Sequence, residues 1–163
     1  MEIKNGIHII DHVKGANIYL CIVGKEILII DTGLPGNAQR ILAQIEALHK
    51  SPKDVSLIIL THSDIDHSGS ASELKKKTGA KIAIHEGDAA GLAGEKELKR
   101  VRGVLGAVFK LMAVFMKFQT VKSDIILKDG DEISQVKVIH TPGHTEGSVV
   151  SILPVICSSS AMS

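Results

Sequence analysis

The stretch Thr61-His62-Ser63-Asp64-Ile65-Asp66-His67 decides the interpretation of this sequence. It follows Val55 to Leu60, an almost unbroken apolar run typical of a strand buried on both faces of a sheet. A loop leaving such a strand can turn neighbouring side chains toward one point, and imidazole and carboxylate groups suit divalent zinc, iron or manganese. The alternative is an ordinary polar turn that happens to contain His and Asp. We predict a metal site formed by His62, Asp64, Asp66 and His67.

On both sides of this stretch, predicted strands alternate with predicted helices, which is typical of an α/β layered domain. Strands are expected at Ile3 to Ile10, Asn17 to Val23, Glu26 to Ile30 and Lys81 to Ile84. One helix is expected from a cap at Asn37 through His49, and another from Gly69 to Lys77, ending at Gly79. Later strands are expected at Ile125 to Ile133 and Val136 to Ile139, around the Asp129-Gly130 turn, and at Val149 to Leu153.

The segment from Glu95 to Phe118 has a different character. It is predicted to be helical, basic at its start and apolar from Val104 onward. Lys110 and Lys117 interrupt its apolar runs, which are shorter than the roughly 20 residues that a membrane span needs. Three roles stay open for residues 104–118: a core or dimer-interface helix, a cap over the active site, or a helix lying at a membrane surface.

Length and composition indicate one domain, residues 1–163, because a chain of 163 residues with 44% hydrophobic content can bury one sizeable core. The net charge of +1 gives no overall field for gathering nucleic acid or binding an anionic membrane. Cys21 and Cys157 lie far apart and suggest neither a disulfide framework nor a thiolate metal site. Because the first ten residues lack the pattern of a secretory signal, we expect a cytoplasmic location.

A second motif runs from His140 to Ser148, with the sequence His-Thr-Pro-Gly-His-Thr-Glu-Gly-Ser. Together with Asp31-Thr32-Gly33, the two motifs resemble those of the metallo-β-lactamase superfamily, which includes glyoxalase II, lactonases, sulfur dioxygenases, nucleases and flavodiiron proteins. The family signature is Thr-His-x-His-x-Asp-His-x-Gly. It is matched by Thr61, His62, Asp66, His67 and Gly69, whereas Asp64 stands where the family has its second histidine.

The resemblance implies a role for each matching residue. His62, Asp64 and His144 would form a first metal position, and Asp66 and His67 would belong to a second. Asp31 would brace the metal loop without touching the metal, because a ligating imidazole needs its other nitrogen held in place. His140 ends a predicted strand and is expected to be structural.

The carboxylate at Asp64 adds negative charge and a harder donor, which shifts the preference from zinc toward iron or manganese. Flavodiiron proteins also have a carboxylate here, but it is a glutamate and they carry a separate flavin domain, so the redox alternative ranks below hydrolysis. The resemblance implies that metal-activated water attacks an ester, thioester, lactone or phosphoester of an unidentified small molecule. In this catalytic role, Asp66 would orient the water or accept its proton.

The family fold is an αββα sandwich of two similar βα halves, and this sequence resembles the first half and the start of the second. The family's bridging Asp and its last His have no counterpart here, so the interpretation is a truncated domain that binds one or two ions. A catalytically impaired metal-binding module, or pseudo-enzyme, is the alternative. Because half a sandwich exposes an apolar sheet face, a homodimer or larger oligomer is expected.

Overall fold

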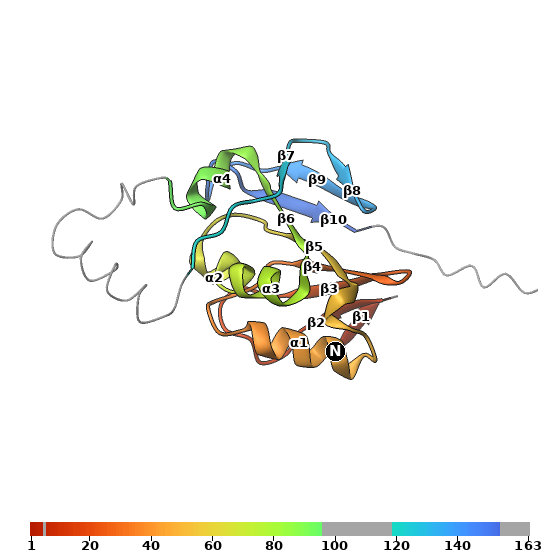
Figure 1. The fold of residues 1–163 in the computed structure, drawn as a ribbon. Helices are drawn as coiled ribbons and strands as arrows, with labels where there is room; N and C mark the ends of the chain where they lie inside the picture. Colours follow the sequence, from red (N-terminus) through yellow and green to blue (C-terminus); the bar gives the residue numbers. More distant parts are fainter. Residues whose placement is uncertain (5, 96–118, 154–163) are drawn as a thin grey trace, which may run out of the picture.

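The computed structural model describes residues 1–4, 6–95 and 119–153 (Figure 1). It contains two β-sheets, a larger one in the order β1-β2-β3-β4-β5-β6-β7 and a smaller one in the order β10-β9-β8. The strands of the larger sheet are β1 (Glu2–Lys4), β2 (Ile7–Ile9), β3 (Tyr19–Val23), β4 (Glu26–Ile30), β5 (Val55–Ile59), β6 (Lys81–His85) and β7 (Ile125–Leu127). Those of the smaller sheet are β8 (Glu132–Ile133), β9 (Val136–His140) and β10 (Val149–Ile152).

The larger sheet is mixed. Strands β1 to β4 form an antiparallel meander, and β4, β5, β6 and β7 then pair in parallel. The helical segments between strands are α1 (Ala38–Ala47), η1 (Pro52–Asp54), α2 (Ile65–Ser68), α3 (Ala71–Thr78) and α4 (Glu86–Leu92). Because parallel strands need crossover connections, α1 and η1 join β4 to β5, and α2 and α3 join β5 to β6.

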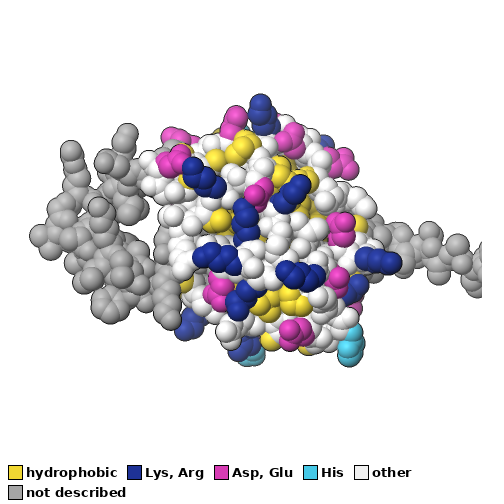
Figure 2. Space-filling view, viewed as in Figure 1, with side chains coloured by type: hydrophobic (Ala, Val, Ile, Leu, Met, Phe, Trp, Pro, Cys, Tyr) yellow, Lys and Arg dark blue, Asp and Glu magenta, His cyan; other side chains and the backbone are white. Residues whose placement is uncertain are grey.

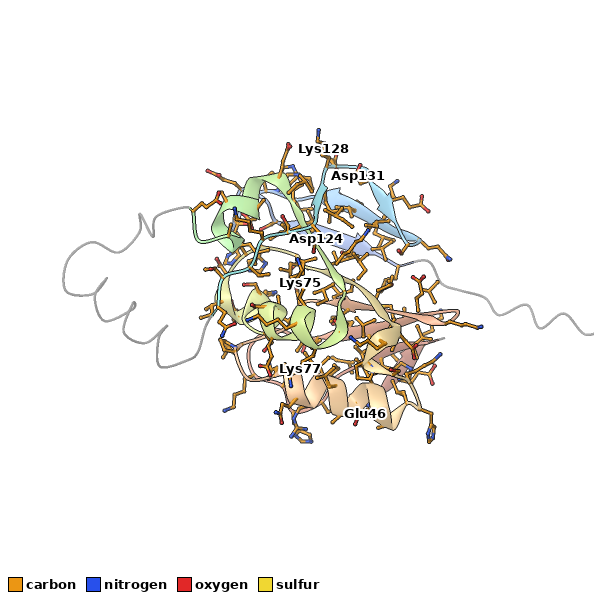
Figure 3. The ribbon with its side chains drawn as sticks, viewed as in Figure 1. Glu46, Lys75, Lys77, Asp124, Lys128 and Asp131 are labelled. Carbon is orange, nitrogen blue, oxygen red and sulfur yellow. The ribbon has the colours of Figure 1, made fainter. Side chains whose placement is uncertain are left out.

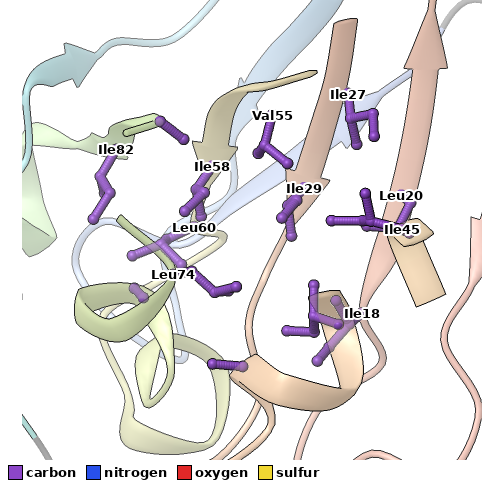
Figure 4. Close-up of a cluster of buried hydrophobic side chains, with 14 of the residues drawn as sticks. Ile18, Leu20, Ile27, Ile29, Ile45, Val55, Ile58, Leu60, Leu74 and Ile82 are labelled. Carbon is purple, nitrogen blue, oxygen red and sulfur yellow. The ribbon is translucent and has the colours of Figure 1, made fainter. Parts of the chain in front are cut away.

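The larger sheet is buried on both faces, since successive strand residues point to opposite sides. Ile29 and Ile58 face α1 and α3, where they pack with Ile45 and Leu74 in the cluster drawn in Figure 4. The residues of the opposite face pack against the smaller sheet; they include Leu28, Ile59, Val136, Val138 and Val149. This arrangement explains the continuous apolar run in β5, and it confirms the predicted α/β sandwich over the described part of the chain.

Several element boundaries differ from the predictions. The expected strand from Ile125 to Ile133 is two strands in different sheets, because the chain turns at Gly130, where φ is 79°. Asn37 does not cap α1 through its side chain. That side chain instead exchanges hydrogen bonds with the backbone of Lys14, whose N–H donates to Oδ1 and whose carbonyl accepts from Nδ2. Gly79 ends α3 with φ of 83°, as predicted.

One helix was not predicted, and one predicted helical segment lies outside the described residues. Helix α4 was not predicted, because the sequence Glu-Gly-Asp-Ala-Ala-Gly-Leu contains two glycines and has weak helix propensity. Residues 96–118, for which a cap, core or interface helix was considered, lie outside the described residues. Among the described helices, none has the length and apolar character required to cross a bilayer.

The face of the molecule seen in Figure 2 carries basic and acidic side chains interspersed with one another. This mixed distribution agrees with the near balance of 19 basic and 18 acidic residues. Neither sign of charge dominates this face, so recognition of a ligand has to depend on local chemistry.

Candidate metal centre

The predicted site residues meet at the carboxyl ends of neighbouring parallel strands. Asp31 follows β4, the segment from Thr61 to His67 follows β5, and His144 lies in the loop between β9 and β10. The backbone joins these loops. The amide and hydroxyl groups of Thr32 donate to the His67 carbonyl at 2.7 and 2.8 Å, and the Val149 amide donates to the Thr61 carbonyl at 3.0 Å. The fold therefore brings together side chains that are distant in the sequence.

Two overlapping groups of side chains could each hold a metal ion. One consists of His62, Asp66 and His67, and the other of His62, Asp64 and His144. Within each group, one potential ligand atom per residue lies within 4.8 Å of the others. The ring of His62 has its centroid 3.9 Å from that of His67 and 4.8 Å from that of His144. His62 is thus common to both groups and occupies the centre of the site.

The two carboxylates approach the histidines from the solvent side. Asp64 Oδ2 lies 3.0 Å from His144 Nε2 and 3.8 Å from His62 Nε2. Asp66 Oδ2 lies 3.7 Å from His67 Nε2. About half of each carboxylate side chain is exposed, 48% for Asp64 and 52% for Asp66, so both can reach a hydrated ion.

Asp31 determines which nitrogen of each ring faces the site. Its Oδ2 accepts hydrogen bonds from the Thr61 hydroxyl at 2.8 Å and from His67 Nδ1 at 2.8 Å. Since the Thr61 hydroxyl proton is directed to Asp31, its oxygen can accept from His62 Nδ1, 3.1 Å away. Both rings then carry their protons on Nδ1 and present unprotonated Nε2 atoms to the centre, as metal binding requires.

The Nε2 atom of His62 is the clearest sign that a ligand belongs here. It is buried, and within the described part of the chain it has no hydrogen-bond partner. A buried polar atom without a partner carries a desolvation cost of about 1–3 kcal/mol, which is why such atoms are rare. A metal ion bound to the free lone pair would remove this cost, so the residues present fit a divalent cation.

Burial and neighbouring groups shift the pKa values of the two central histidines in opposite directions. Burial lowers the pKa of His62, and a charge on nearby His67 would lower it further. The hydrogen bond to Asp31 raises the pKa of His67. His62 is therefore neutral at ordinary pH, whereas His67 takes up a second proton more readily, and a metal ion would compete with that proton for its Nε2.

The centre opens into a cavity of about 450 Å³. Its lining includes His62, His67 and His144 together with Asn17 and Tyr19. A small organic molecule fits a cavity of this size.

The structure gathers every residue predicted for the site: His62, Asp64, Asp66, His67, His144 and Asp31. His140 lies apart from it. Its Nε2 lies 2.9 Å from the Glu146 carbonyl, and its ring stacks on that of His85 with centroids 3.9 Å apart. Two roles were not predicted from the sequence: that of the Thr61 hydroxyl, which connects Asp31 to His62, and that of the buried carboxylate of Asp88. The only sequence signal for Asp88 is an acidic residue in the first turn after a strand.

Comparisons with known proteins agree with this geometry. The family model for the metallo-beta-lactamase superfamily matches residues 13–155. The uncharacterized protein YobT of Bacillus subtilis is 34% identical over 137 residues, which cover 82% of this chain and 54% of YobT. The human acyl-coenzyme A thioesterase MBLAC2 is 28% identical over 151 residues, covering 82% of this chain and 52% of that enzyme.

Among solved structures, the class B3 di-zinc metallo-beta-lactamase LRA-12 from an Alaskan soil metagenome superposes with a TM-score of 0.75. It shares 29% identity, and the match covers 91% of this chain and 54% of that structure. This chain spans about half the length of the curated relatives it matches.

Proposed function

Because this chain belongs to the metallo-β-lactamase superfamily, we propose that its candidate metal centre is a hydrolytic site. The proposed activity is hydrolysis of an ester, thioester, lactone or phosphoester by metal-activated water. The observation that carries it is the unpartnered Nε2 of His62, buried where two groups of ligand atoms converge. Among these substrates we favour a thioester, because one relative is an acyl-coenzyme A thioesterase.

The proposed ligands are His62, Asp64 and His144 for one ion, with Asp66 and His67 available for a second. When bound, a divalent zinc, iron or manganese ion lowers the pKa of water toward neutrality and polarises the oxygen of the scissile bond. Asp31 and Thr61 keep the rings of His62 and His67 in the required tautomers. Asp66, half exposed beside His67, would orient the attacking water, or accept its proton where no second ion is bound.

Metal content and turnover, measured on the same preparations, test this proposal. Elemental analysis should find zinc, iron or manganese in the parent protein and background amounts in the His62→Ala, His144→Ala double variant. Hydrolysis of a short acyl-coenzyme A thioester should be lost on chelation and restored when metal is returned. The matched control is His49→Ala, which removes a histidine outside the site.

Two results would count against the proposal. If the double variant keeps as much metal as the parent, the ligand assignment is wrong. If the metal-loaded protein hydrolyses none of the thioester, ester, lactone and phosphodiester probes, the proposed hydrolytic activity is wrong, even when the metal site is confirmed.

A further inference from the structure

We propose that Asp88, a buried carboxylate on α4, is a positioning residue that holds the loop carrying His144 against the loop carrying His62 and Asp64. This inference rests on the proposed metal site and adds a residue that no family motif supplies. Asp88 belongs to neither group of potential metal ligands. It acts through the backbone segments that carry three of the proposed ligands, His62, Asp64 and His144.

The hydrogen bonds of Asp88 connect both ligand loops. The residue is only 3% exposed. Its Oδ2 accepts from the backbone N–H of Ser63 at 3.0 Å and from the Thr145 hydroxyl at 2.7 Å, and its Oδ1 accepts from the Gly147 N–H at 3.1 Å. Ser63 lies between His62 and Asp64, and Thr145 follows His144 directly. One carboxylate thus binds a neighbour of each ligand, across a wide separation in the sequence.

The backbones around Asp88 pack too closely for side chains to intervene. A Cβ atom on Gly147 would lie 2.6 Å from the Asp88 nitrogen, and one on Gly87 would lie 2.9 Å from the Glu146 carbonyl oxygen. On the next turn of α4, a Cβ atom on Gly91 would lie 2.7 Å from the Ser63 hydroxyl oxygen. Glycine at these positions allows α4 to lie directly against both loops. The Asp88 carboxylate is therefore within hydrogen-bond distance of both.

His144 depends on this support because its own ring is poorly packed. Its side chain is 68% exposed, and its Nε2 shares a hydrogen bond with Asp64 Oδ2. The position of the ring is therefore determined mainly by the backbone of its loop. Hydrogen bonds to a buried carboxylate are about twice as strong as neutral ones, so those from Thr145 and Gly147 restrain that loop effectively.

The test measures zinc affinity by competition with a chelator and records the visible ligand-field spectrum of the Co²⁺-loaded protein. Asp88→Asn keeps the shape of the side chain but replaces one acceptor oxygen by a donor, so the bond to Ser63 or to Gly147 is lost. We expect zinc affinity to fall about 10- to 100-fold, as for other residues that orient ligands, and the Co²⁺ spectrum to change. In a His144→Ala background, the same substitution should lower affinity by a smaller factor, because the part of its effect that passes through His144 is then absent.

The matched control is Asp124→Asn. Asp124 also joins separate segments, accepting from Lys75 Nζ at 2.7 Å (Figure 3) and from the Ile82 amide at 2.8 Å, but it belongs to neither group of potential metal ligands. Its loss should leave zinc affinity and the Co²⁺ spectrum unchanged. If Asp88→Asn fails to fold by circular dichroism, Thr145→Val replaces it. That variant removes one donor to Asp88 at a half-buried position and should shift both readouts in the same direction.

The outcomes separate this inference from the proposed function. Unchanged affinity and spectrum in Asp88→Asn, or in Thr145→Val where it substitutes, would overturn the inference while leaving the metal site intact. An undiminished effect of Asp88→Asn in the His144→Ala background would also overturn it. If His144→Ala alone leaves zinc affinity unchanged, then His144 is not a ligand, and both the ligand assignment and the inference fail.

Discussion

At the scale of single residues, the protonation of the site follows from one carboxylate. Asp31 accepts from the Thr61 backbone amide as well as from its hydroxyl and from His67, so three donors converge on it. It is 4% exposed and adopts a left-handed backbone with φ of 59°, which Asp and Asn tolerate better than most residues. The carboxylate is therefore held firmly, and its hydrogen bonds fix the orientation of both central imidazoles.

Replacing Asp31 by asparagine tests this role without adding backbone strain, because asparagine also accepts a positive φ. The amide nitrogen would face either Thr61 or His67 and disturb the tautomer that metal binding needs. We expect the dissociation constant for zinc to rise about 10- to 100-fold while the protein stays folded. Chelator competition measures this change, with the exposed Asp11→Asn as control. A dissociation constant equal to that of the parent would exclude the orienting role.

The motif residues themselves could be identified from the sequence, because His62, Asp64, Asp66 and His67 lie within six residues of one another, directly after a buried strand. Of the residues that orient them, Asp31 was predicted through the family resemblance, but its hydrogen-bond partners and the role of Asp88 were not. The links from Asp31 to His67 and from Asp88 to Thr145 join positions far apart in the chain, and only the folded backbone brings them within hydrogen-bond distance. Thr61 was recognised as part of the family signature but without a role for its hydroxyl, and nothing in the sequence distinguishes Asp88 from an ordinary residue in the first turn of a helix.

At the scale of elements, the junction of β6 and α4 is sensitive to pH. His85 is 5% exposed, its Nδ1 accepts from the Gly87 amide as the cap of α4, and its ring stacks on that of His140. Burial lowers the pKa of His85, and a charge on His140 would lower it further. The folded protein therefore binds a proton at His85 less readily than the unfolded chain, whose histidine pKa is about 6.5.

The sign of the pH effect follows from this difference. Well above pH 6.5, His85 is neutral in both states and contributes no pH dependence. As the pH falls below that value, the unfolded chain takes up the proton first, so the free energy of unfolding decreases. We expect denaturant melts to show this decrease in the parent and a smaller one in His85→Asn, which keeps a capping acceptor but cannot titrate. Equal pH dependence in the two proteins would contradict the assignment.

Helix α3 illustrates what periodicity predicts well. Leu74 lies on its buried stripe, is fully buried and packs in the cluster between helices and sheet (Figure 4). Leu74→Ala should lower the free energy of unfolding by about 2–5 kcal/mol, because it removes apolar contacts and leaves a cavity. The exposed Lys77→Ala on the same helix should change it by less than about 0.5 kcal/mol. Denaturant titration of both variants measures the difference, and similar values would place Leu74 outside the core.

Strands were predicted most accurately where a single apolar run is bounded by turn residues, as for β4 and β5. The predicted boundaries were wrong where tertiary contacts, rather than the local sequence, determine where an element begins or ends. The strand expected from Ile125 to Ile133 contains the Asp129-Gly130 turn, and the chain changes sheets there, so that β7 joins the larger sheet and β8 the smaller. Helix α4 was missed because its stability comes from close packing on the metal loops through glycines rather than from helix propensity.

At the scale of the whole molecule, the smaller sheet has one face in the core and one toward solvent. Val149 is buried against the larger sheet, whereas Val150 and Ile152 point the other way with 50% and 46% of their surface exposed. In β9, Ile139 is paired with Val150, so apolar side chains adjoin on the outer face. Such adjoining apolar groups favour association, because their removal from water contributes about 25 cal/mol per Å².

The predicted homo-oligomer can be tested on this face. We expect light scattering coupled to size exclusion to give a mass above that of one chain at tens of micromolar, falling toward a monomer on dilution. The double variant Val150→Thr, Ile152→Thr keeps β-branched residues in the strand but makes its outer face polar, so it should be monomeric at the same concentration. Ile126→Thr is the matched control, since Ile126 is also 46% exposed but lies on β7 in the other sheet. A parent that is monomeric throughout would reject self-association. A double variant that still associates would move the interface away from β10, because the strand would then have lost its apolar outer surface without consequence.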